Sequence, residues 1–335
     1  MLKIEDVKKS AEKADQLKKT LGQVLFGQER LIDLVITGLL AQGHLLLEGL
    51  PGLGKTELVN GLSQALGLDF KRIQFTPDLL PGDITGNPMF NEENGKREFV
   101  FQPGPIFGNL VLGDEINRAS PKTQSAMLEA MQERKVTVSG TTHELPKPFF
   151  VLATQNPIEL EGTYALPEAQ LDRFLFKLYI DRNSVEILEK IVLHRELSVS
   201  PVIEQVMSKS DLQEMISQVR KIHIPDVVAK MIAQLVDATH PGQSKSADQV
   251  KFGAGPRAAI ALASAVKAHA LIKGRVHAGF EDVKDLALPV LRHRVILDYK
   301  ARLEGFTADS LIQEILAEIK ITDRSVPSTL TESTE

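Results

Sequence analysis

The chain has 335 residues, of which 43% are hydrophobic and 25% are charged, and its formal net charge is −5 at pH 7. This length and composition are typical of a globular protein of about two domains, and no apolar stretch approaches the roughly 20 residues that cross a bilayer, so membrane insertion is not expected. The absence of cysteine excludes disulfides, thiol nucleophiles and cysteine-ligated zinc, and the acidic balance disfavours a protein that binds nucleic-acid phosphates.

The first predicted elements are two helices, over residues 4–22 and 29–41, joined by a turn that contains Phe26 and Gly27. The N-terminal segment is charged and amphipathic and lacks the apolar centre of a signal peptide. We therefore expect the protein in the cytoplasm.

A glycine-rich loop then follows an apolar strand over residues 44–48 and precedes a helix over residues 57–66. Its sequence is Gly49-Leu-Pro-Gly-Leu-Gly-Lys-Thr56. A loop of this kind between a strand and a helix cradles phosphate with its backbone N–H groups, while Lys55 reaches the terminal phosphates and the Thr56 hydroxyl reaches Mg²⁺. The alternative is a tight turn without a ligand. We predict ATP or GTP binding by Phe26, Gly27, Gly49, Leu50, Pro51, Gly52, Leu53, Gly54, Lys55, Thr56 and Glu57.

A strand is predicted at residues 70–75, and the pattern then changes. Residues 76–108 hold five prolines and five glycines, with two short strand-like pieces at residues 84–86 and 98–101. A segment of this length between regular elements predicts an insertion with a fold of its own.

Two adjacent carboxylates, Asp114 and Glu115, end the next apolar strand. Paired acids at the edge of a core are costly unless they meet a cation or a reacting water. We assign Asp114 to Mg²⁺ and Glu115 to the base that polarises the attacking water. The alternative is a strand that leaves the core at a polar turn. A helix over residues 120–132 and a β-hairpin formed by residues 135–138 and 143–145 are predicted next.

Asn156 follows another buried strand, over residues 149–153. The carboxyl ends of parallel strands carry the ligand groups, so Asn156 is expected beside the acidic pair, where it would hold the water or sense the γ-phosphate. An asparagine that only opens a turn before proline is the alternative. A short helix near residues 167–173 and a fifth strand at residues 174–180 complete the sheet.

Helices dominate from residue 181 onward, and we place a domain boundary near Arg182. Arg257 lies in the first turn of a predicted helix, where a cation faces the unfavourable end of the helix dipole. Either a nearby anion or a neighbouring carboxylate explains that placement. The tail, residues 323–335, has the composition of a disordered segment.

Several motifs in this order resemble the MoxR family of AAA+ ATPases over roughly residues 20–300. They are the phosphate loop, Gly113-Asp-Glu-Ile-Asn-Arg-Ala119, Ala153-Thr-Gln-Asn-Pro157, Glu168-Ala-Gln-Leu-Asp-Arg-Phe174 and Gly255-Pro-Arg257. The fold class implied is α/β: a five-stranded parallel P-loop sheet flanked by helices, followed by an all-α lid domain. The α/β domain would cover residues 1–181, with a helix-2 insertion at about 76–105 and a hairpin at about 135–147, and the lid would cover residues 182–322.

The resemblance also implies a ring-forming, Mg²⁺-dependent ATPase, usually hexameric, with a chaperone-like role in remodelling or maturing client proteins, often ones with von Willebrand factor A domains. By position, Asn156 resembles sensor 1, Arg257 resembles sensor 2 and Arg173 resembles the arginine finger. Taken alone, the sequence Asp172-Arg173 is typical of a surface pair, and one chain does not show whose phosphate Arg173 faces. The glutamate-switch residue is not fixed, with Gln74 as a candidate. The preference for ATP over GTP also rests on the resemblance.

Two other functions remain open at this stage. A nucleic-acid motor of the helicase or transcription-activator type shares this core, and its contacts would be Lys96, Arg97, Lys135 and Lys147; the net charge and the few aromatic residues weigh against it. The second open function is a nucleotide-controlled switch that does no mechanical work. The eight histidines include no pair four residues apart, so no zinc site of the His-Glu-x-x-His type is expected.

Overall fold

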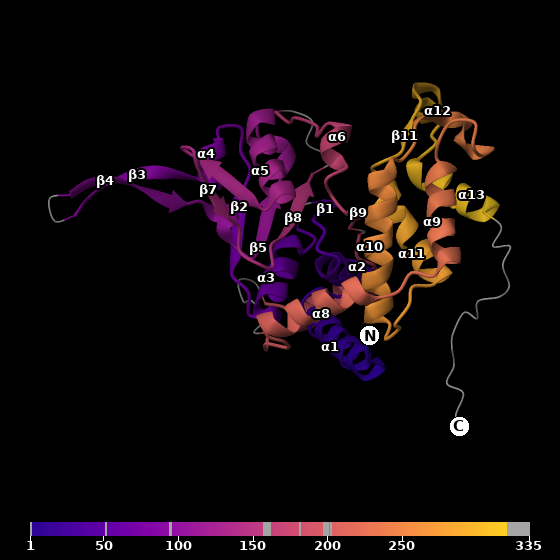
Figure 1. Ribbon diagram of the computed structural model, residues 1–335, viewed down its shortest axis with the longest axis horizontal. Helices are drawn as coiled ribbons and strands as arrows, with labels where there is room; N and C mark the ends of the chain where they lie inside the picture. Colours follow the sequence, from indigo (N-terminus) through magenta and orange to yellow (C-terminus); the bar gives the residue numbers. More distant parts are fainter. Residues whose placement is uncertain are drawn as a thin grey trace. The chain divides into compact units, whose positions relative to one another are not determined.

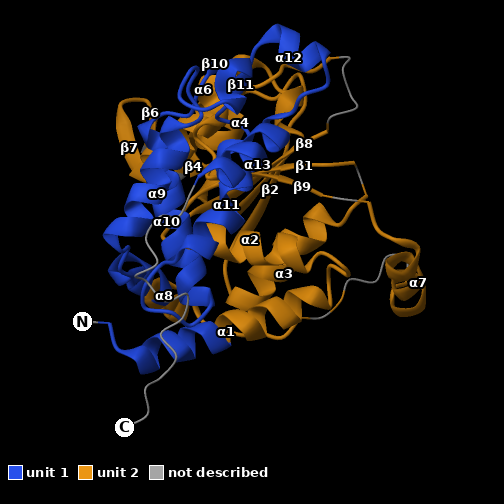
Figure 2. Ribbon diagram, turned by 90° about the vertical axis from the view of Figure 1, so that its right-hand side faces the viewer, with its two compact units in different colours: residues 1–12, 215–335 blue, residues 13–214 orange. Residues whose placement is uncertain are grey.

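The computed structural model describes residues 2–50, 52–93, 96–156, 162–180, 182–196, 201 and 203–319. The chain forms two compact units, one of residues 13–214 and one of residues 1–12 with 215–335 (Figure 2). The first holds a mixed α/β fold and the second is mainly helical. The unit around the sheet extends beyond the boundary expected near Arg182, and the division into functional domains stays a prediction.

A five-stranded parallel sheet forms the centre of the α/β unit, which confirms the predicted fold class. The three inner strands are buried on both faces because helices cover them, as their nearly continuous apolar sequences indicate. Their order across the sheet is β2 (Phe70–Gln74), β5 (Leu110–Asp114), β8 (Phe150–Gln155), β1 (Leu45–Glu48) and β9 (Phe176–Tyr179).

Side chains alternate between the two faces of these strands, and each face packs on helices. Leu46, Val111 and Val151 belong to one cluster with Met127 and Met131 of α5 (Pro121–Glu133). Figure 1 shows α5 on one side of the sheet and α3 (Lys55–Leu66) on the other. The remaining helices of this unit are the second half of α1 (Ile4–Gly22), α2 (Glu29–Leu40), α4 (Pro81–Thr85), η1 (Pro105–Phe107), η2 (Ile116–Arg118), α6 (Glu168–Leu171), α7 (Val185–His194) and the start of α8 (Lys209–Lys221).

The insertion contains a long antiparallel hairpin, β3 (Gly86–Glu93) and β4 (Lys96–Pro103), that extends away from the sheet (Figure 1). The prediction of a strand at residues 84–86 was wrong for Ile84 and Thr85, which lie in α4. Pro81 supplies the backbone angle of a first helical turn, and the Asp83 carboxylate accepts a hydrogen bond of 2.9 Å from the Leu80 N–H. The second predicted hairpin is present as β6 (Lys135–Val138) and β7 (Thr141–Glu144).

The second unit contains the helical lid and two short strands that the sequence did not predict. β10 (Val250–Phe252) and β11 (Ile296–Leu297) pair in antiparallel fashion. Strands of two or three residues are too short to show a period of two, which explains the omission. The helices are α9 (Asp226–Asp237), η3 (Ser246–Gln249), α10 (Pro256–Ile272), α11 (Phe280–Leu291), α12 (Tyr299–Leu303) and α13 (Ala308–Glu318).

The remaining expectations about the fold concern the C-terminal tail and membrane-spanning helices. The tail predicted to be disordered, residues 323–335, lies outside the described residues. Within the part of the chain that the structure describes, no helix combines the length and the apolar character needed to cross a membrane.

Candidate functional site

The glycine-rich loop runs from the end of β1 to the start of α3, as the sequence predicts. Gly52 and Gly54 have φ angles of 79° and 81°, in the left-handed region that favours glycine. A Cβ atom at Gly54 would lie 2.6 Å from the Leu25 side chain. Both the backbone conformation and the close approach of residue 25 therefore require glycine at this position.

Lys55 and Thr56 begin α3 at the end of this loop. The Lys55 ammonium donates a hydrogen bond of 2.6 Å to the Gly49 carbonyl, across the loop. Partial burial lowers the pKa of Lys55, and the nearby carboxylates of Asp114, Glu115 and Glu48 act in the opposite direction. The acidic neighbours favour the charged ammonium, and a cation partly shielded from water attracts an added anion more strongly than a solvated one does.

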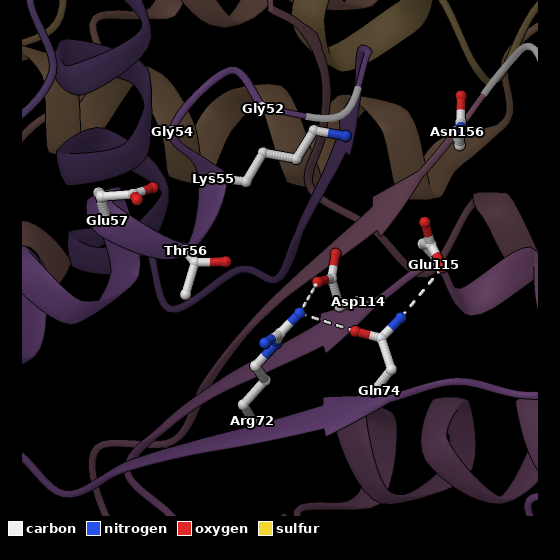
Figure 3. A pocket seen from close by; sticks show the side chains of 10 residues that line it. All are labelled: Gly52, Gly54, Lys55, Thr56, Glu57, Arg72, Gln74, Asp114, Glu115 and Asn156. Atoms are coloured by element: carbon white, nitrogen blue, oxygen red, sulfur yellow. Dashed lines mark hydrogen bonds and ion pairs between the residues drawn. The ribbon is translucent and has the colours of Figure 1, made fainter. Parts of the chain in front are cut away.

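A pocket of about 320 Å³ opens between this loop and the carboxyl ends of the central strands (Figure 3). It brings together eight of the predicted site residues and two residues from the edge strand β2. The predicted residues are Gly52, Gly54, Lys55, Thr56, Glu57, Asp114, Glu115 and Asn156, and the additional ones are Arg72 and Gln74.

Other predicted residues lie elsewhere or cannot be placed. Phe26 packs near Arg195, whose guanidinium carbon is 5.5 Å from the ring centre, and a Cβ at Gly27 would meet the Ile187 side chain. Neither residue lines the pocket, nor do Gly49, Leu50 and Leu53, although all three belong to the loop around it. Pro51 lies outside the described residues.

The two arginines assigned by resemblance do not line the pocket in the described part of the chain. Arg173 lines a separate pocket beside α5, where its guanidinium donates a hydrogen bond of 3.0 Å to the Leu128 carbonyl. Arg257 lies at the start of α10, in the other compact unit. The roles of both residues stay predictions.

Asp114 is held on both of its oxygens. The Thr154 hydroxyl donates to Oδ1 at 2.6 Å, and the Arg72 guanidinium donates to Oδ2 at 2.7 Å. Thr154 also accepts a hydrogen bond of 2.9 Å from the backbone N–H of Glu115. Fully buried Thr154 therefore fixes both acidic residues relative to β8.

Glu115 has a left-handed backbone conformation, with a φ angle of 58°, which is uncommon for a residue other than glycine. Backbone strain of this kind concentrates at functional sites. Its Oε2 accepts hydrogen bonds of 3.0 Å from both the Gln74 amide and the Arg118 guanidinium. Glu115 is thus oriented by two donors, one from β2 and one from the turn that follows β5.

Sequence reasoning missed Arg72, Thr154 and Arg118 as members of this site. Arg72 and Gln74 are two residues apart on β2, so their side chains leave the same face of the strand. The parallel register then places Gln74 opposite Asp114. The alternation could be read from the sequence, but the pairing of β2 with β5 could not.

The donor set fits a magnesium ion. The Thr56 hydroxyl and one Asp114 carboxylate are hard oxygen ligands, which Mg²⁺ prefers. Across the described residues there is no cluster of three or more histidine or acidic side chains that could hold a metal. A cation here would complete its shell with phosphate oxygens and water, which is how Mg²⁺ is usually bound in nucleotide sites.

The parallel sheet, the phosphate loop and the paired acids define an AAA+ ATPase. In agreement, residues 44–176 match the family described as "ATPase family associated with various cellular activities (AAA)", and residues 243–315 match the AAA lid domain.

Three relatives refine this assignment. Chaperone MoxR1 of Mycobacterium tuberculosis is 39% identical over 303 residues, which are 89% of this chain and 80% of that one. An uncharacterized protein of Bacillus subtilis, YeaC, is 45% identical over 90% of this chain and 92% of its own length. A crystal structure of a candidate ATPase from Cytophaga hutchinsonii superposes with a TM-score of 0.88 at 40% identity, covering 95% of this chain and 98% of that chain. The chain belongs to the MoxR family of AAA+ ATPases.

Proposed function

We propose that the protein binds ATP with Mg²⁺, hydrolyses it, and uses the turnover for a chaperone-like remodelling of client proteins. The observation that carries the proposal is the convergence of Lys55, Thr56, Asp114, Glu115 and Asn156 on one pocket. These residues come from three different segments of the chain. Together they supply the groups that phosphoryl transfer to water requires.

Each residue has a distinct part in this proposal. The loop amides and Lys55 bind the phosphates, and Thr56 with Asp114 holds Mg²⁺, which neutralises charge on the β- and γ-phosphates. Glu115 accepts the proton of the attacking water. Asn156 orients that water or the γ-phosphate from the end of β8.

Glu115 is tied to Gln74 and Arg118 in the structure. Both bonds fall on Oε2 of the carboxylate, so they restrain its orientation as long as they persist. The Gln74 contact supports this residue as the glutamate switch, which would release Glu115 for catalysis.

The oligomeric part of the proposal is a homo-oligomeric ring, of six subunits by family resemblance. Arg173 lines a pocket of its own and not the nucleotide pocket of its chain. This supports a role on the γ-phosphate of a neighbouring subunit. Arg257 would act as the sensor 2 residue, as the family resemblance implies.

The client would contact the insertion, in the cytoplasm, through the β3–β4 hairpin. This hairpin exposes aromatic residues that a monomer would normally bury, with Phe90 57% and Phe99 73% accessible. Clients with von Willebrand factor A domains are the class that the family resemblance suggests. An increase of ATP turnover on addition of such a client would separate remodelling from simple switching.

Two substitutions test the catalytic proposal. Lys55→Ala should weaken ATP binding at least about 100-fold, because the charge-assisted contacts to the terminal phosphates are lost. Glu115→Gln should retain ATP affinity and lose about 10² to 10⁴ in kcat, the usual contribution of a general base. Equilibrium binding and steady-state hydrolysis measure the two effects.

Lys71→Ala is the matched control for Lys55→Ala. Lys71 lies on β2, pairs with Asp69 at 3.6 Å, and does not line the pocket, so both ATP binding and hydrolysis should be retained. Full hydrolysis by Glu115→Gln would refute the assignment of the base.

A further inference from the structure

Arg72 makes two contacts from a single nitrogen. Its Nη2 donates to Asp114 Oδ2 and to Gln74 Oε1, both at 2.7 Å, and the Gln74 amide in turn donates to Glu115 Oε2 at 3.0 Å. Figure 3 shows these contacts as dashed lines that join Asp114, Arg72, Gln74 and Glu115 in that order. The residue assigned to Mg²⁺ and the residue assigned to the water are therefore linked through two side chains of β2.

Arg72 competes for the carboxylate oxygen that a cation would use. Thr154 donates to Oδ1 of Asp114 and Arg72 donates to Oδ2, so a cation that approaches Oδ2 meets Arg72. A guanidinium stays charged at any ordinary pH. Arg72 lies 2.7 Å from Oδ2 of Asp114. A divalent ion bound at the same oxygen would repel the guanidinium, so each cation weakens the binding of the other.

We propose that Arg72 is a positioning residue that holds Asp114 until a divalent cation takes its Oδ2. Its departure then withdraws the support of Gln74 and leaves Glu115 held by Arg118 alone. This inference rests on the proposed function, since it assumes Mg²⁺ and ATP in this pocket. It adds a coupling between the entry of the metal ion and the loss of one of the two donors that restrain the catalytic base.

The position of Arg72 suits such a movement. β2 is an edge strand, and the Arg72 side chain is 48% exposed, whereas that of Asp114 is 16% exposed. A half-exposed arginine can move into solvent with little loss of packing. The Arg72–Asp114 pair is also weak enough to exchange, because pairs this exposed contribute little net stability.

The test compares the affinity of a non-hydrolysable ATP analogue in excess Mg²⁺ with its affinity in EDTA. The ratio of the EDTA Kd to the Mg²⁺ Kd is the measured quantity. ATP analogues bind Mg²⁺ in solution to the same extent whatever variant is present, so this contribution cancels between variants. Hydrolysis does not enter the measurement.

Arg72→Gln should raise this ratio at least about threefold. Without the guanidinium, two carboxylates face the bare phosphates and the metal-free affinity falls, while the cation enters without having to displace Arg72. Arg72→Lys keeps the charge and should stay near the wild-type ratio. Lys71→Gln is the matched control, because Lys71 is the adjacent residue on β2 and is also 48% exposed, but is paired with Asp69 outside the pocket.

A purely structural role of Arg72, or a direct contact with phosphate, would lower both affinities together. An unchanged ratio in Arg72→Gln would therefore overturn the proposal. If Arg72→Gln does not fold, Arg72→Met provides the same loss of charge. The ratio of its EDTA Kd to its Mg²⁺ Kd is then compared with the wild-type ratio in the same way.

The link through Gln74 is tested by a double-mutant cycle on the same ratio. Gln74→Leu removes one partner of Arg72 and should raise the ratio in the wild-type chain. It should add nothing in Arg72→Gln, because the two residues act in series. Additive effects would overturn the link.

The outcome for the wild-type chain separates this proposal from the one on which it rests. Failure to bind the analogue in either condition would refute the proposed function. Binding that Mg²⁺ strengthens, with equal ratios for wild type and Arg72→Gln, would refute only the role of Arg72.

Discussion

His44 illustrates how a single buried residue joins elements of the core. Its Nε2 donates to the Met131 carbonyl at the end of α5, and its Nδ1 accepts from the Val151 N–H of β8, both at 3.0 Å. This pattern requires the neutral imidazole, with the proton on Nε2. Burial is the main cause that lowers the pKa of His44 from 6.5 to about 4.

The pH dependence of stability follows from that pKa. The unfolded chain takes up a proton below about pH 6.5, whereas the folded chain does not until about pH 4. The contribution of His44 is therefore complete above pH 6.5 and falls by about 1.4 kcal/mol per pH unit down to about pH 4. Between pH 7.5 and 5, the free energy of unfolding should fall by about 2 kcal/mol more in the wild type than in His44→Gln.

Urea unfolding of both proteins at the two pH values checks this prediction. The difference between wild type and variant isolates His44, because the other titrating groups are common to both chains. Equal pH dependence in the two proteins would contradict a buried neutral imidazole.

The predicted site residues that line the pocket are those whose proposed roles follow from local sequence. Lys55 and Thr56 are fixed by the loop that precedes them, and Asp114 and Glu115 by the strand that they end. Arg72 lies more than 40 residues from its carboxylate partner in the chain. Its role depends on strand order, which propensity and periodicity do not encode.

At the scale of elements, a buried acid connects two helices of the lid. Asp282, in the first turn of α11, accepts hydrogen bonds from His269 of α10, from Arg275 and from the Gly279 N–H. Burial alone would raise the pKa of Asp282, but these donors outweigh it and hold the pKa below its ordinary value. The carboxylate is therefore charged and fully paired.

Asp282→Ala should destabilise the lid by about 3 kcal/mol, because it leaves a partly buried guanidinium and a buried imidazole without their acceptor. Thermal or denaturant unfolding measures the loss. Asp15→Ala is the control: Asp15 is 58% exposed and pairs with Lys19 one helical turn away, so its removal should leave stability nearly unchanged. Equal effects of the two substitutions would contradict the structural role of Asp282.

Long, periodic elements were predicted closely from the sequence, and some of the short ones were not. The helix at residues 4–22 has the same bounds in the structure, whereas Ile84 and Thr85 were placed in a strand and lie in a five-residue helix. A helix of 19 residues repeats its apolar pattern several times. A helix of one turn depends on its capping contacts instead, which the apolar pattern does not reveal.

At the scale of the whole molecule, the proposed ring predicts that active sites are shared between subunits. Arg173→Ala and Glu115→Gln should each be inactive alone. In an equimolar mixture, about a quarter of the sites would combine an intact Glu115 with an intact Arg173 from the neighbour, so hydrolysis should partly recover. Steady-state ATP hydrolysis of the mixture measures the recovery.

The control mixture combines Lys55→Ala with Glu115→Gln. Both residues line the same pocket of one chain, so every site in that mixture keeps a defect and activity should stay absent. The absence of recovery in the Arg173 mixture would contradict a finger supplied by a neighbour.

The edge strand β2 continues directly into the insertion. Residues 75–80 alone separate Gln74 from α4, and the hairpin follows α4 without a break. The two hairpins also touch, since the Phe101 ring of β4 stacks on the His143 ring of β7 at 3.9 Å. In the proposed cycle, a tensile load on the protruding hairpin would pass along the backbone to β2, and the rate of hydrolysis would then depend on mechanical resistance outside the nucleotide pocket.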